Sequence, residues 1–256
     1  MVDPLTSNTS TIERFFDKMA GERNAIFRIN PVLDYEQRVR SCTVLGLLNA
    51  KTGETILDVG CGNARDIKQI VGSGATVVGV DLSHEMINEA MREFTEAESV
   101  NVQLEIGDVT MLRFPAESFD KILCSEVIEH VPDLERAISE MYRVLKPGGY
   151  LVVSSPNRHS WYGFDRFVIW SKILRRKWDH PFDDWKSIRE VHALLERHGF
   201  GVVGSTTACY LPGFVLTYKL PTWLQRVVVR CTEAADPIVS WAFPRAGYML
   251  ACSVKK

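Results

Sequence analysis

Glycines and carboxylates follow three apolar runs, at positions where parallel strands would end along one edge of a sheet. Gly60 and Gly62 follow the first run, while Asp81 ends the second. Asp108 follows the third. Glycine lets the backbone come close to a ligand, and the N-terminus of a following helix favours polar or charged ligand groups. A carboxylate at the end of a second strand is placed to bind the two hydroxyls of a ribose. We therefore expect a nucleoside-sized groove along this edge.

A second group of chemically active side chains follows the fourth apolar run. Glu126, Glu129 and His130 stand at i, i+3 and i+4, so a helical turn would place them on one face at the mouth of the groove. One hypothesis makes His130, with Glu129 beside it, the base that removes a proton from an attacking hydroxyl, since imidazole titrates near neutral pH. In a second hypothesis the three side chains hold a divalent cation such as Mg²⁺ for a hydroxylated substrate. In a third, the segment is a polar rim that contacts a cofactor and caps the next helix.

The elements that must position these residues are short apolar runs that alternate with helical stretches. The predicted strands span residues 55–59, 76–80, 102–106, 121–125, 150–154, 202–206 and 248–254. Strands separated by helices are typical of βαβ units in an α/β fold, whose parallel sheet is covered on both faces. Ser83 predicts the start of a helix that runs to about residue 97. Pro132 opens another, which continues to Leu145 and ends at the turn 146–149.

The pattern predicts one domain, residues 1–256, with a cap over the open edge of the sheet. We expect an N-terminal helical segment at residues 1–50 and a cofactor-binding core at residues 51–156. The two cap segments are expected at residues 157–198 and 208–246, and the last two strands at residues 199–207 and 247–255.

Both cap segments are rich in aromatic and aliphatic residues. Residues 161–178 combine them with the basic cluster Arg175, Arg176 and Lys177, and residues 210–243 are broken by prolines. Such segments suit a packed cap, a cover for an apolar substrate or a peripheral contact with a membrane surface. His180 also lies in the cap and is a further candidate catalytic residue, where it would face the substrate.

Composition excludes several classes of protein. Hydrophobic residues make up 46% of the 256 residues and charged residues 24%, which is typical of a globular chain. The net charge of -2 predicts no binding to nucleic acid, because no global positive field would attract phosphates. No apolar run reaches the ~18 residues of a spanning helix, and the first residues lack the order of a secretory signal, so we expect a cytoplasmic protein. The six cysteines stand singly, which predicts neither structural zinc nor a disulfide framework.

The groove residues belong to a set of motifs that resembles the class I S-adenosylmethionine-dependent methyltransferases (methyltransferase type 11). The motifs recur in the family's order and spacing: Leu-Asp-Val-Gly-Cys-Gly (57–62), Gly-Val-Asp (79–81), Gly-Asp (107–108), Phe-Asp-Lys-Ile (119–122) and Leu-Lys-Pro-Gly-Gly (145–149). The resemblance implies a Rossmann-like, seven-stranded, mostly parallel sheet with helices on both faces, plus the helical cap.

By this resemblance the groove binds S-adenosylmethionine and releases S-adenosylhomocysteine. The residues implied to bind the cofactor follow the first four strands: Asp58, Gly60, Cys61, Gly62, Asp81, Leu82, Asp108, Val109 and Ser125. The two glycines approach the methionine part, Asp81 binds the ribose hydroxyls, and Asp108 with Val109 borders the adenine. Asp58 either orders the turn or binds the amino group of the ligand. Many members carry a further glycine where this chain has Ala64.

A closer resemblance is to the ubiquinone-biosynthesis O-methyltransferases. Residues 124–133 (Cys-Ser-Glu-Val-Ile-Glu-His-Val-Pro-Asp) are similar to their segment after strand four, and residues 28–31 (Arg-Ile-Asn-Pro) to an element near their start. In that family an arginine that contacts the cofactor follows this element, whereas Val32, Leu33 and Asp34 follow it here. The Glu-x-x-Glu-His-Val-Pro pattern also occurs in methyltransferases of other small molecules.

We therefore predict methyl transfer to a small, lipophilic or ring-containing acceptor, at oxygen. Holding the nucleophile in line with a sulfonium methyl and removing its proton supplies most of the rate. Nitrogen or carbon acceptors in a metabolite or lipid stay open, as does a non-catalytic protein that binds the cofactor and docks on a partner or a membrane. A nicotinamide-dependent dehydrogenase would share Gly60, Gly62 and Asp81, but the turn lacks the third glycine of that class.

Overall fold

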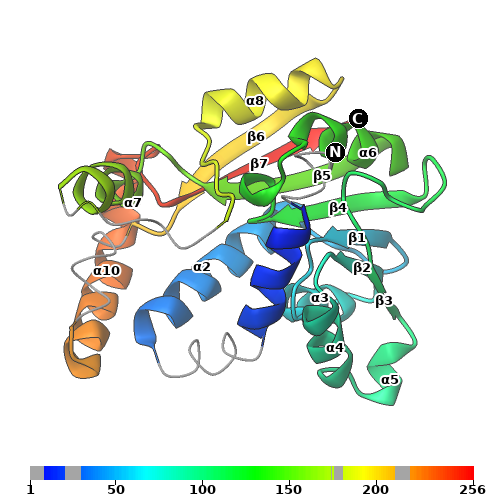
Figure 1. Cartoon of the computed structure of the whole chain (residues 1–256), viewed down its shortest axis with the longest axis horizontal. Coiled ribbons are helices and arrows are strands. Elements are labelled where there is room, and N and C mark those ends of the chain that lie inside the picture. Colours follow the sequence, from blue (N-terminus) through cyan, green and yellow to red (C-terminus); the bar gives the residue numbers. More distant parts are fainter. Residues whose placement is uncertain (1–8, 21–29, 174, 176–180, 211–219) are drawn as a thin grey trace.

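The computed structural model describes residues 9–20, 30–173, 175, 181–210 and 220–256, and Figure 1 shows an open, twisted sheet with helices packed around it. The seven strands lie in the order β3-β2-β1-β4-β5-β7-β6. Their bounds are β1 Thr55–Val59, β2 Thr76–Asp81, β3 Val102–Ile106, β4 Phe119–Ser125, β5 Leu145–Pro156, β6 Gly201–Ala208 and β7 Met249–Lys255. Strand β7 runs antiparallel to its neighbours β5 and β6, and the other pairs are parallel. The predicted seven-stranded, mostly parallel α/β sheet is confirmed.

The register of the parallel strands brings their carboxyl ends to one edge. Val59 of β1 pairs with Val80 of β2 on one side and with Cys124 of β4 on the other. Asp81, the last residue of β2, pairs with Ile106 of β3. The loops that follow these pairs therefore leave the sheet side by side, at the edge where open α/β sheets bind ligands.

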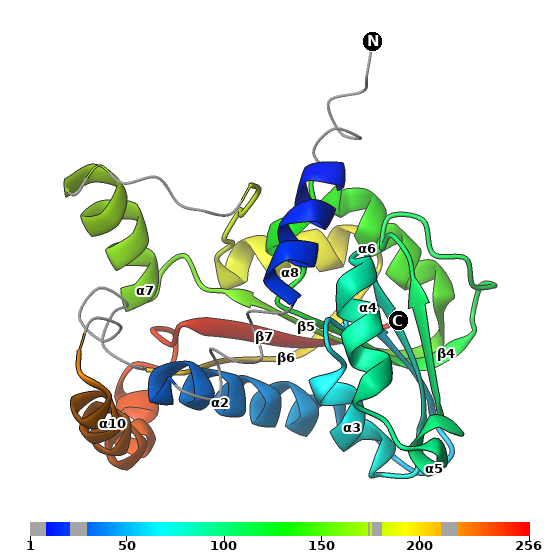
Figure 2. The same ribbon diagram turned by 60° about the horizontal axis from the view of Figure 1, so that its bottom comes forward.

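Alternation along the buried strands builds one hydrophobic core on each face of the sheet. In β4, Ile122 and Cys124 belong to the first core, whereas Leu123 between them belongs to the second. The first core is completed by α6 (Leu134–Val144) and α8 (Ile188–Arg197), and the second by α2 (Pro31–Leu48) and α3 (Arg65–Val71). Helices therefore cover both faces, as predicted (Figures 1 and 2).

The remaining helices lie at the ends and edges of the sheet. They are α4 His84–Arg92, α5 Glu96–Ser99, the 3₁₀ turn η1 Ile128–His130, α7 Trp161–Phe164, the π-helical η2 Asp165–Ile173 and α10 Thr222–Ala242. Residues 9–20 form a further helix, called the N-terminal helix below and drawn in dark blue near α4 in Figure 2.

The helix predicted after Ser83 is shorter than expected. The Ser83 hydroxyl caps α4 by accepting a hydrogen bond from the Met86 N–H at 3.1 Å, which confirms the predicted start. Helix α4 nevertheless ends at Arg92, and α5 begins with a capping box of its own formed by Thr95 and Glu98. The capping box of α5 therefore divides the single helix that the sequence pattern predicts.

Two further boundaries differ because of local hydrogen bonding. Helix α6 begins at Leu134 and not at Pro132, since the Asp133 side chain accepts a hydrogen bond from the Arg136 N–H and so sets the cap. Residues 146–149 are not a turn outside the sheet but an irregularity within β5, where the register with β4 shifts. The glycines there accommodate the extra residues of the bulge.

Helix α10 continues through Pro237, so the prediction that this proline breaks the segment is wrong. A proline within a helix removes one backbone hydrogen bond. The inward face of α10 is held against α2: the Tyr35 hydroxyl hydrogen-bonds to the Asp236 carboxylate, and the Arg38 guanidinium pairs with Glu233 at 3.0 Å. These contacts, at residues just before the proline, hold the helix against α2.

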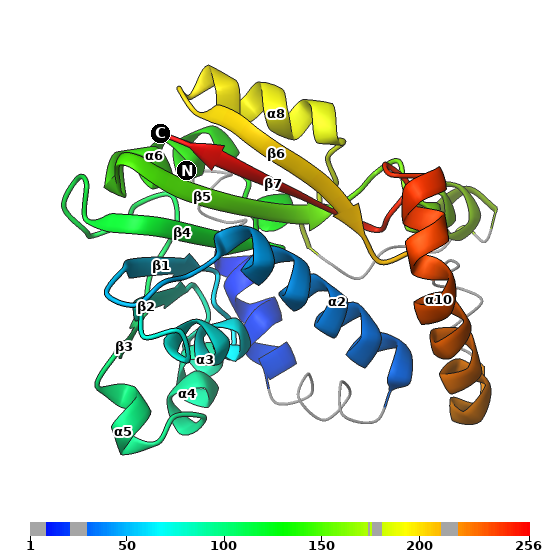
Figure 3. The same cartoon turned by 180° about the vertical axis from the view of Figure 1, so that it is seen from behind.

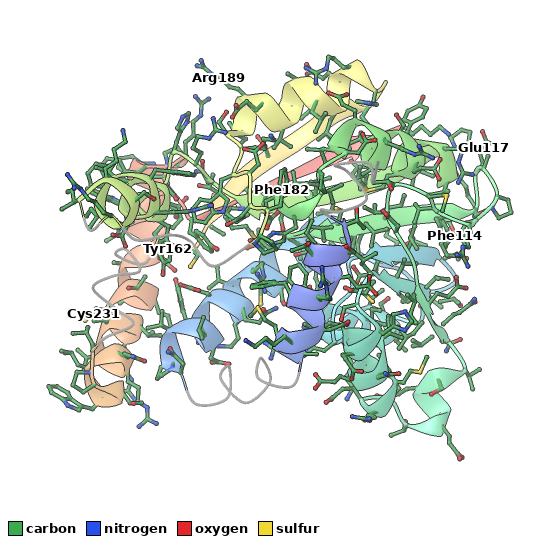
Figure 4. The ribbon with its side chains drawn as sticks, viewed as in Figure 1. Phe114, Glu117, Tyr162, Phe182, Arg189 and Cys231 are labelled. Carbon is green, nitrogen blue, oxygen red and sulfur yellow. The ribbon has the colours of Figure 1, made fainter. Side chains whose placement is uncertain are left out.

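A third apolar cluster joins α2, α7 and α10 beyond the carboxyl end of the sheet. Its buried members are Val32, Tyr35, Tyr162, Trp185, Cys209 and Val229. Tyr162, labelled in Figure 4, also donates a hydrogen bond to Glu36 of α2. Among the segments that the structure describes, none of the helices has the length and apolar character that crossing a membrane requires.

Candidate functional site

A cavity of about 360 Å³ lies at the carboxyl edge of the sheet, between the N-terminal helix, α2 and the ends of β1 to β4. This volume is within the range of pockets that hold small ligands. The residues predicted to bind the cofactor all line it: Asp58, Gly60, Cys61, Gly62, Asp81, Leu82, Asp108, Val109 and Ser125. Glu126 and His130 line the same cavity. The fold therefore brings together residues from four separate strand ends.

The turn after β1 requires glycine at Gly60. Its φ is +69°, and a Cβ there would come within 2.3 Å of Val127 Cγ2. The Gly60 N–H donates to the Val80 carbonyl at 2.7 Å, which ties the turn to the end of β2. Ala64, at the start of α3, has a left-handed φ of 58° and is buried, so the methyl group fits where many relatives carry glycine.

The Asp81 carboxylate is oriented by backbone donors on both sides. Its Oδ2 accepts from the Gly62 N–H at 2.8 Å, and its Oδ1 accepts from the Ser83 N–H at 2.8 Å. The two backbone donors fix the orientation of the carboxylate at the cavity wall.

Asp108 organises the loop after β3. Its Oδ1 accepts from both the Thr110 N–H at 2.8 Å and the Thr110 hydroxyl at 2.7 Å. The resulting turn places Val109 in the cavity wall. The loop thus offers an apolar side chain and a carboxylate next to one another, which suits the border of a nucleobase.

Asp58 is a buried carboxyl at the cavity wall. Burial raises its pKa well above the usual range, and the nearby charges of Asp66 and Asp81 raise it further. No residue in the described ranges donates a hydrogen bond to its side chain, so Asp58 does not order the turn in that way. A cationic ligand group beside Asp58 would lower this pKa, because an opposite charge favours the carboxylate.

Two arginines of the cavity were missed by the sequence analysis. Arg40 of α2 and Arg65 at the start of α3 both line it. Burial opposes the charge of Arg40, but the charges of Glu126 and Asp66 outweigh it and raise the pKa of the guanidinium. Its Nη1 lies 3.8 Å from Glu126 Oε2.

The start of α2 explains why Arg40 was overlooked. The Asn30 side chain accepts hydrogen bonds from the N–H groups of Val32 and Leu33, and Pro31 occupies the first helical position. The helix therefore begins at Pro31, the last residue of the Arg-Ile-Asn-Pro element, and its cavity-lining arginine, Arg40, lies in the middle of the helix. A helical-wheel reading of residues 31–48 was the signal that could have found it.

His130 stands at the mouth of the cavity against the N-terminal helix. Its ring meets the Phe16 ring edge to face with centroids 5.2 Å apart, and both residues line the cavity. His130 Nδ1 is 3.1 Å from the Phe182 carbonyl oxygen. A carbonyl only accepts, so this contact assigns the proton of the neutral ring to Nδ1 and leaves Nε2 as an acceptor. Figure 4 shows Phe182 near the centre of the molecule, at this edge of the sheet.

Glu129 lies beneath His130 and does not line the cavity. Its side chain is 2% exposed, and Oε1 is 3.8 Å from His130 Nε2. Burial raises the pKa of Glu129 well above the usual range, and the charges of Glu126 and Asp183 add to this effect while Arg40 opposes it. Its Oε2 has no hydrogen-bond partner among the residues that the structure describes.

The predicted shared face of Glu126, Glu129 and His130 does not form. Glu126 has a φ of +57°, which turns the chain out of any helix, and the 3₁₀ turn starts only at Ile128. The Glu126 carboxylate instead accepts a hydrogen bond from the Ser154 hydroxyl at 3.0 Å. Within the described part of the chain, no three His, Cys, Asp or Glu side chains are grouped to hold a metal ion. The candidate His180 lies outside the described residues.

Comparison with known proteins identifies the family. The methyltransferase domain model matches residues 57–153. Over 211 residues the chain is 30% identical to a demethylmenaquinone methyltransferase of Tropheryma whipplei, which covers 75% of this chain and 84% of that protein. The chain belongs to the S-adenosylmethionine-dependent methyltransferases. A further relative of this methyltransferase is the ubiquinone biosynthesis O-methyltransferase of Coxiella burnetii, at 36% identity over 142 residues. That match spans 55% of this chain and little more than half, 56%, of the relative's length.

Solved structures support the methyltransferase fold. A methyltransferase of Thermotoga maritima, described as a possible histamine N-methyltransferase, has a TM-score of 0.64 and 20% identity, and covers 95% of this chain and 99% of its own. A putative methyltransferase in complex with the Haloferax volcanii Trm112 activator has a TM-score of 0.66 and 18% identity, and covers 94% and 96%. At such identities the likeness concerns the fold of the methyltransferase and not its substrate.

Proposed function

We propose that this protein transfers a methyl group from S-adenosylmethionine to an oxygen of a small, lipophilic or ring-containing acceptor. The observation that carries the proposal is that the predicted cofactor residues and His130 line the same cavity. Relatives named for ubiquinone biosynthesis and for demethylmenaquinone support an apolar ring as the acceptor class.

The cavity residues fit the parts of S-adenosylmethionine. Asp81 would bind the ribose hydroxyls, and Asp108, Val109 and Leu82 would border the adenine. Asp58 would face the amino group, since its buried carboxyl gains most from a cationic neighbour.

The methionine end fits the opposite part of the cavity. The close backbone approach at Gly60 and Gly62 leaves room for it, and Arg40 or Arg65 would pair with its carboxylate. When bound, the cofactor supplies a methyl group that its sulfonium already activates. Catalysis by this chain then consists of orienting the acceptor and removing its proton.

His130 is the group proposed to take that proton. Its Nδ1–H is held by the Phe182 carbonyl, which keeps Nε2 free of a proton in the neutral ring. When Nε2 accepts a proton, the positive charge of the imidazolium favours ionisation of the Glu129 carboxyl, whose Oε1 is 3.8 Å away. Asp183 Oδ1 lies 4.0 Å from Nδ1 on the other side of the ring. Glu129 is thus a positioning residue that acts through His130.

Apolar side chains around His130 support a lipophilic acceptor. Ile12 and Phe16 of the N-terminal helix, together with Val127 and Val131, line the cavity on this side. Side chains of this kind would exclude water from the reacting atoms and pack against an apolar acceptor. A demethylated quinone of the menaquinone kind is a second candidate acceptor, because the relative matched over most of its length is named for it.

Titration calorimetry with S-adenosylmethionine, S-adenosylhomocysteine and NAD in parallel tests the cofactor. We expect binding of the first two in the micromolar range and none of NAD. Transfer of a labelled methyl group is then measured on a catechol with a prenyl chain and on the same catechol without it. A preference for the prenylated catechol supports the acceptor class. Equal rates, or transfer only to amines, would contradict it. Cofactor binding without any transfer would favour a non-catalytic binding protein.

A further inference from the structure

The outward face of α10 is apolar although it faces solvent. Its large side chains are Trp223, Val227, Ile238 and Trp241, which are 66%, 47%, 70% and 84% exposed. With 3.6 residues per turn these positions fall on one side of the helix, and a tryptophan stands near each end. Monomeric proteins rarely leave a contiguous face of this kind uncovered.

The protein's own packing uses the opposite side of the same helix. Val229 and Thr232 are buried there, and Glu233 and Asp236 make their contacts with α2 on that side. The outward face is therefore not covered by another described segment. Helix α10 has apolar residues on two sides, and one of these sides is exposed to solvent.

Neighbouring elements extend the exposed apolar surface. Trp161 and Phe164 of α7, Ile173 of η2 and Phe243 after α10 are all exposed. Figures 1, 2 and 3 show α7 and α10 together at one end of the molecule, away from α5. We call this end, with the outward face of α10, the apolar end.

Four exposed cations lie at the apolar end. Arg226 and Arg230 lie on the outward half of α10, and Lys172 and Arg175 lie on or next to η2. None of these four forms an ion pair with any residue in the described ranges. Both acidic residues of α10 contact α2: Glu233, which is itself exposed, pairs with Arg38, and Asp236 accepts a hydrogen bond from the Tyr35 hydroxyl. Asp165 of η2 is buried.

We propose that the apolar end docks the protein on the surface of an anionic lipid bilayer, with α10 lying in the plane of the interface. Tryptophan is enriched at the level of the lipid headgroups. A helix that combines an apolar face with arginines on its flanks binds the interface through buried area and through attraction to anionic lipids. The four exposed cations complement such lipids, and the one exposed carboxylate of α10, Glu233, is neutralised by its ion pair with Arg38.

The docked orientation brings the cavity close to the bilayer. Helix α2 contacts α10 through Tyr35 and Arg38 and contributes Gln37 and Arg40 to the cavity wall. The arrowheads of β5 and β6 point toward α10 in Figure 3, so the carboxyl edge of the sheet faces the apolar end. The inference goes beyond the proposed function, since attachment to lipid requires neither S-adenosylmethionine nor the acceptor.

Vesicle flotation of the full chain tests the proposal. We expect the protein to float with vesicles of phosphatidylcholine that contain phosphatidylglycerol and to stay in solution with phosphatidylcholine alone. Trp223→Ser with Trp241→Ser, and separately Arg226→Gln with Arg230→Gln, are expected to lower the partition coefficient by roughly tenfold or more, as expected for lost interfacial aromatic area and for two cations near the surface.

Matched controls change the same residue types away from the apolar end. Met91→Ser with Val100→Ser alters exposed apolar residues of α4 and the end of α5, and Arg92→Gln with Arg189→Gln removes two exposed cations. We expect both controls to bind vesicles like the original protein. Circular dichroism and the melting temperature of each variant establish that it is folded.

Brominated lipid separates insertion from adsorption. Bromine at the upper acyl positions should quench tryptophan fluorescence. Trp161→Phe combined with Trp223→Phe and Trp241→Phe should keep flotation but lose most of the quenching. Flotation that is unaffected by the α10 substitutions would overturn the proposal. So would a dimer in sedimentation velocity that the serine substitutions dissociate, because a second copy would then cover the face.

Discussion

The cofactor cavity and the apolar end differ in how their side chains are held. At the cavity, the Asp81 carboxylate is oriented by two backbone N–H groups, and Gly60 leaves no room for a side chain. At the apolar end, Trp223 and Trp241 are well exposed on a helix whose opposite side alone is packed. The groups of the cavity are held in fixed orientations, whereas the apolar end presents exposed apolar surface and positive charge that do not select a particular ligand shape.

This difference teaches which changes each region tolerates. A preorganised site loses function when a single atom is added or removed, because its groups are held to fractions of an ångström. A surface that binds through area and charge loses affinity gradually, residue by residue. The predictions below test that contrast, from the largest expected effect to the smallest.

Gly60→Ala is expected to have the largest effect. The added Cβ would meet Val127 Cγ2 at 2.3 Å, and the φ of +69° is strained for alanine. We expect a loss of stability of roughly 2–5 kcal/mol from strain and overpacking, and no measurable S-adenosylmethionine binding. Calorimetry and thermal melting check this. Gly53→Ala is the matched control: its φ is +81° with nothing within 4 Å, so only the smaller cost of strain should appear.

His130→Ala is expected to lower kcat by about 100-fold or more, because it removes the proposed base. The affinity for S-adenosylmethionine should change little, since the ring stands at the cavity mouth. Single-turnover rates with the accepted substrate and calorimetry with the cofactor separate the two effects. A kcat within twofold of the original would leave His130 as a residue of the polar rim.

Asp81→Ala is expected to weaken S-adenosylmethionine binding by roughly 1–3 kcal/mol, the cost of lost hydrogen bonds to a buried polar ligand. Glu96→Ala, on the exposed first turn of α5, is the control. Unchanged affinity in Asp81→Ala would mean that the ribose lies elsewhere in the cavity.

Glu129→Gln changes how stability depends on pH. The folded-state pKa of Glu129 is raised by burial, so the protonated carboxyl stabilises the fold below the unfolded pKa, and this contribution is lost as the pH rises through the folded pKa. Glutamine cannot ionise, so the melting temperature of the variant should rise relative to that of the original protein as the pH increases from 4 to neutrality. A difference in melting temperature that stays constant across this pH range would contradict a raised pKa for Glu129.

Trp223→Ser with Trp241→Ser should have the smallest effect on the cavity. Both residues are exposed, so the free energy of unfolding should change by no more than about 0.5 kcal/mol for each, and the cofactor affinity should stay the same. Melting and calorimetry of the soluble variant check this. A large loss of cofactor binding would show that the two regions are not independent.

Several features of this protein could be read from the sequence because they depend on neighbours along the chain. The strand 55–59 has the predicted bounds, since a buried parallel strand is a short apolar run between turns. The edge strand 102–106 also has the predicted bounds, and its apolar residues alternate with polar ones. The glycine turn and the carboxylates after β1, β2 and β3 are local as well, and parallel strands must bring such ends to one edge. The part of the cavity wall that follows the strand ends was therefore predictable from the sequence.

Only the tertiary structure decided the other half of the site. Arg40 and Phe16 reach the cavity because α2 and the N-terminal helix pack against the carboxyl edge, and nothing in their own segments specifies that neighbour. Glu126 left the predicted helical face because its left-handed backbone and the Ser154 hydroxyl hold it elsewhere. Which side of α10 stays exposed is decided by α2, which packs against the other side of that helix. Periodicity and turn chemistry are properties of adjacent residues, whereas burial and partner choice depend on segments far apart in the chain, and these become neighbours only on folding.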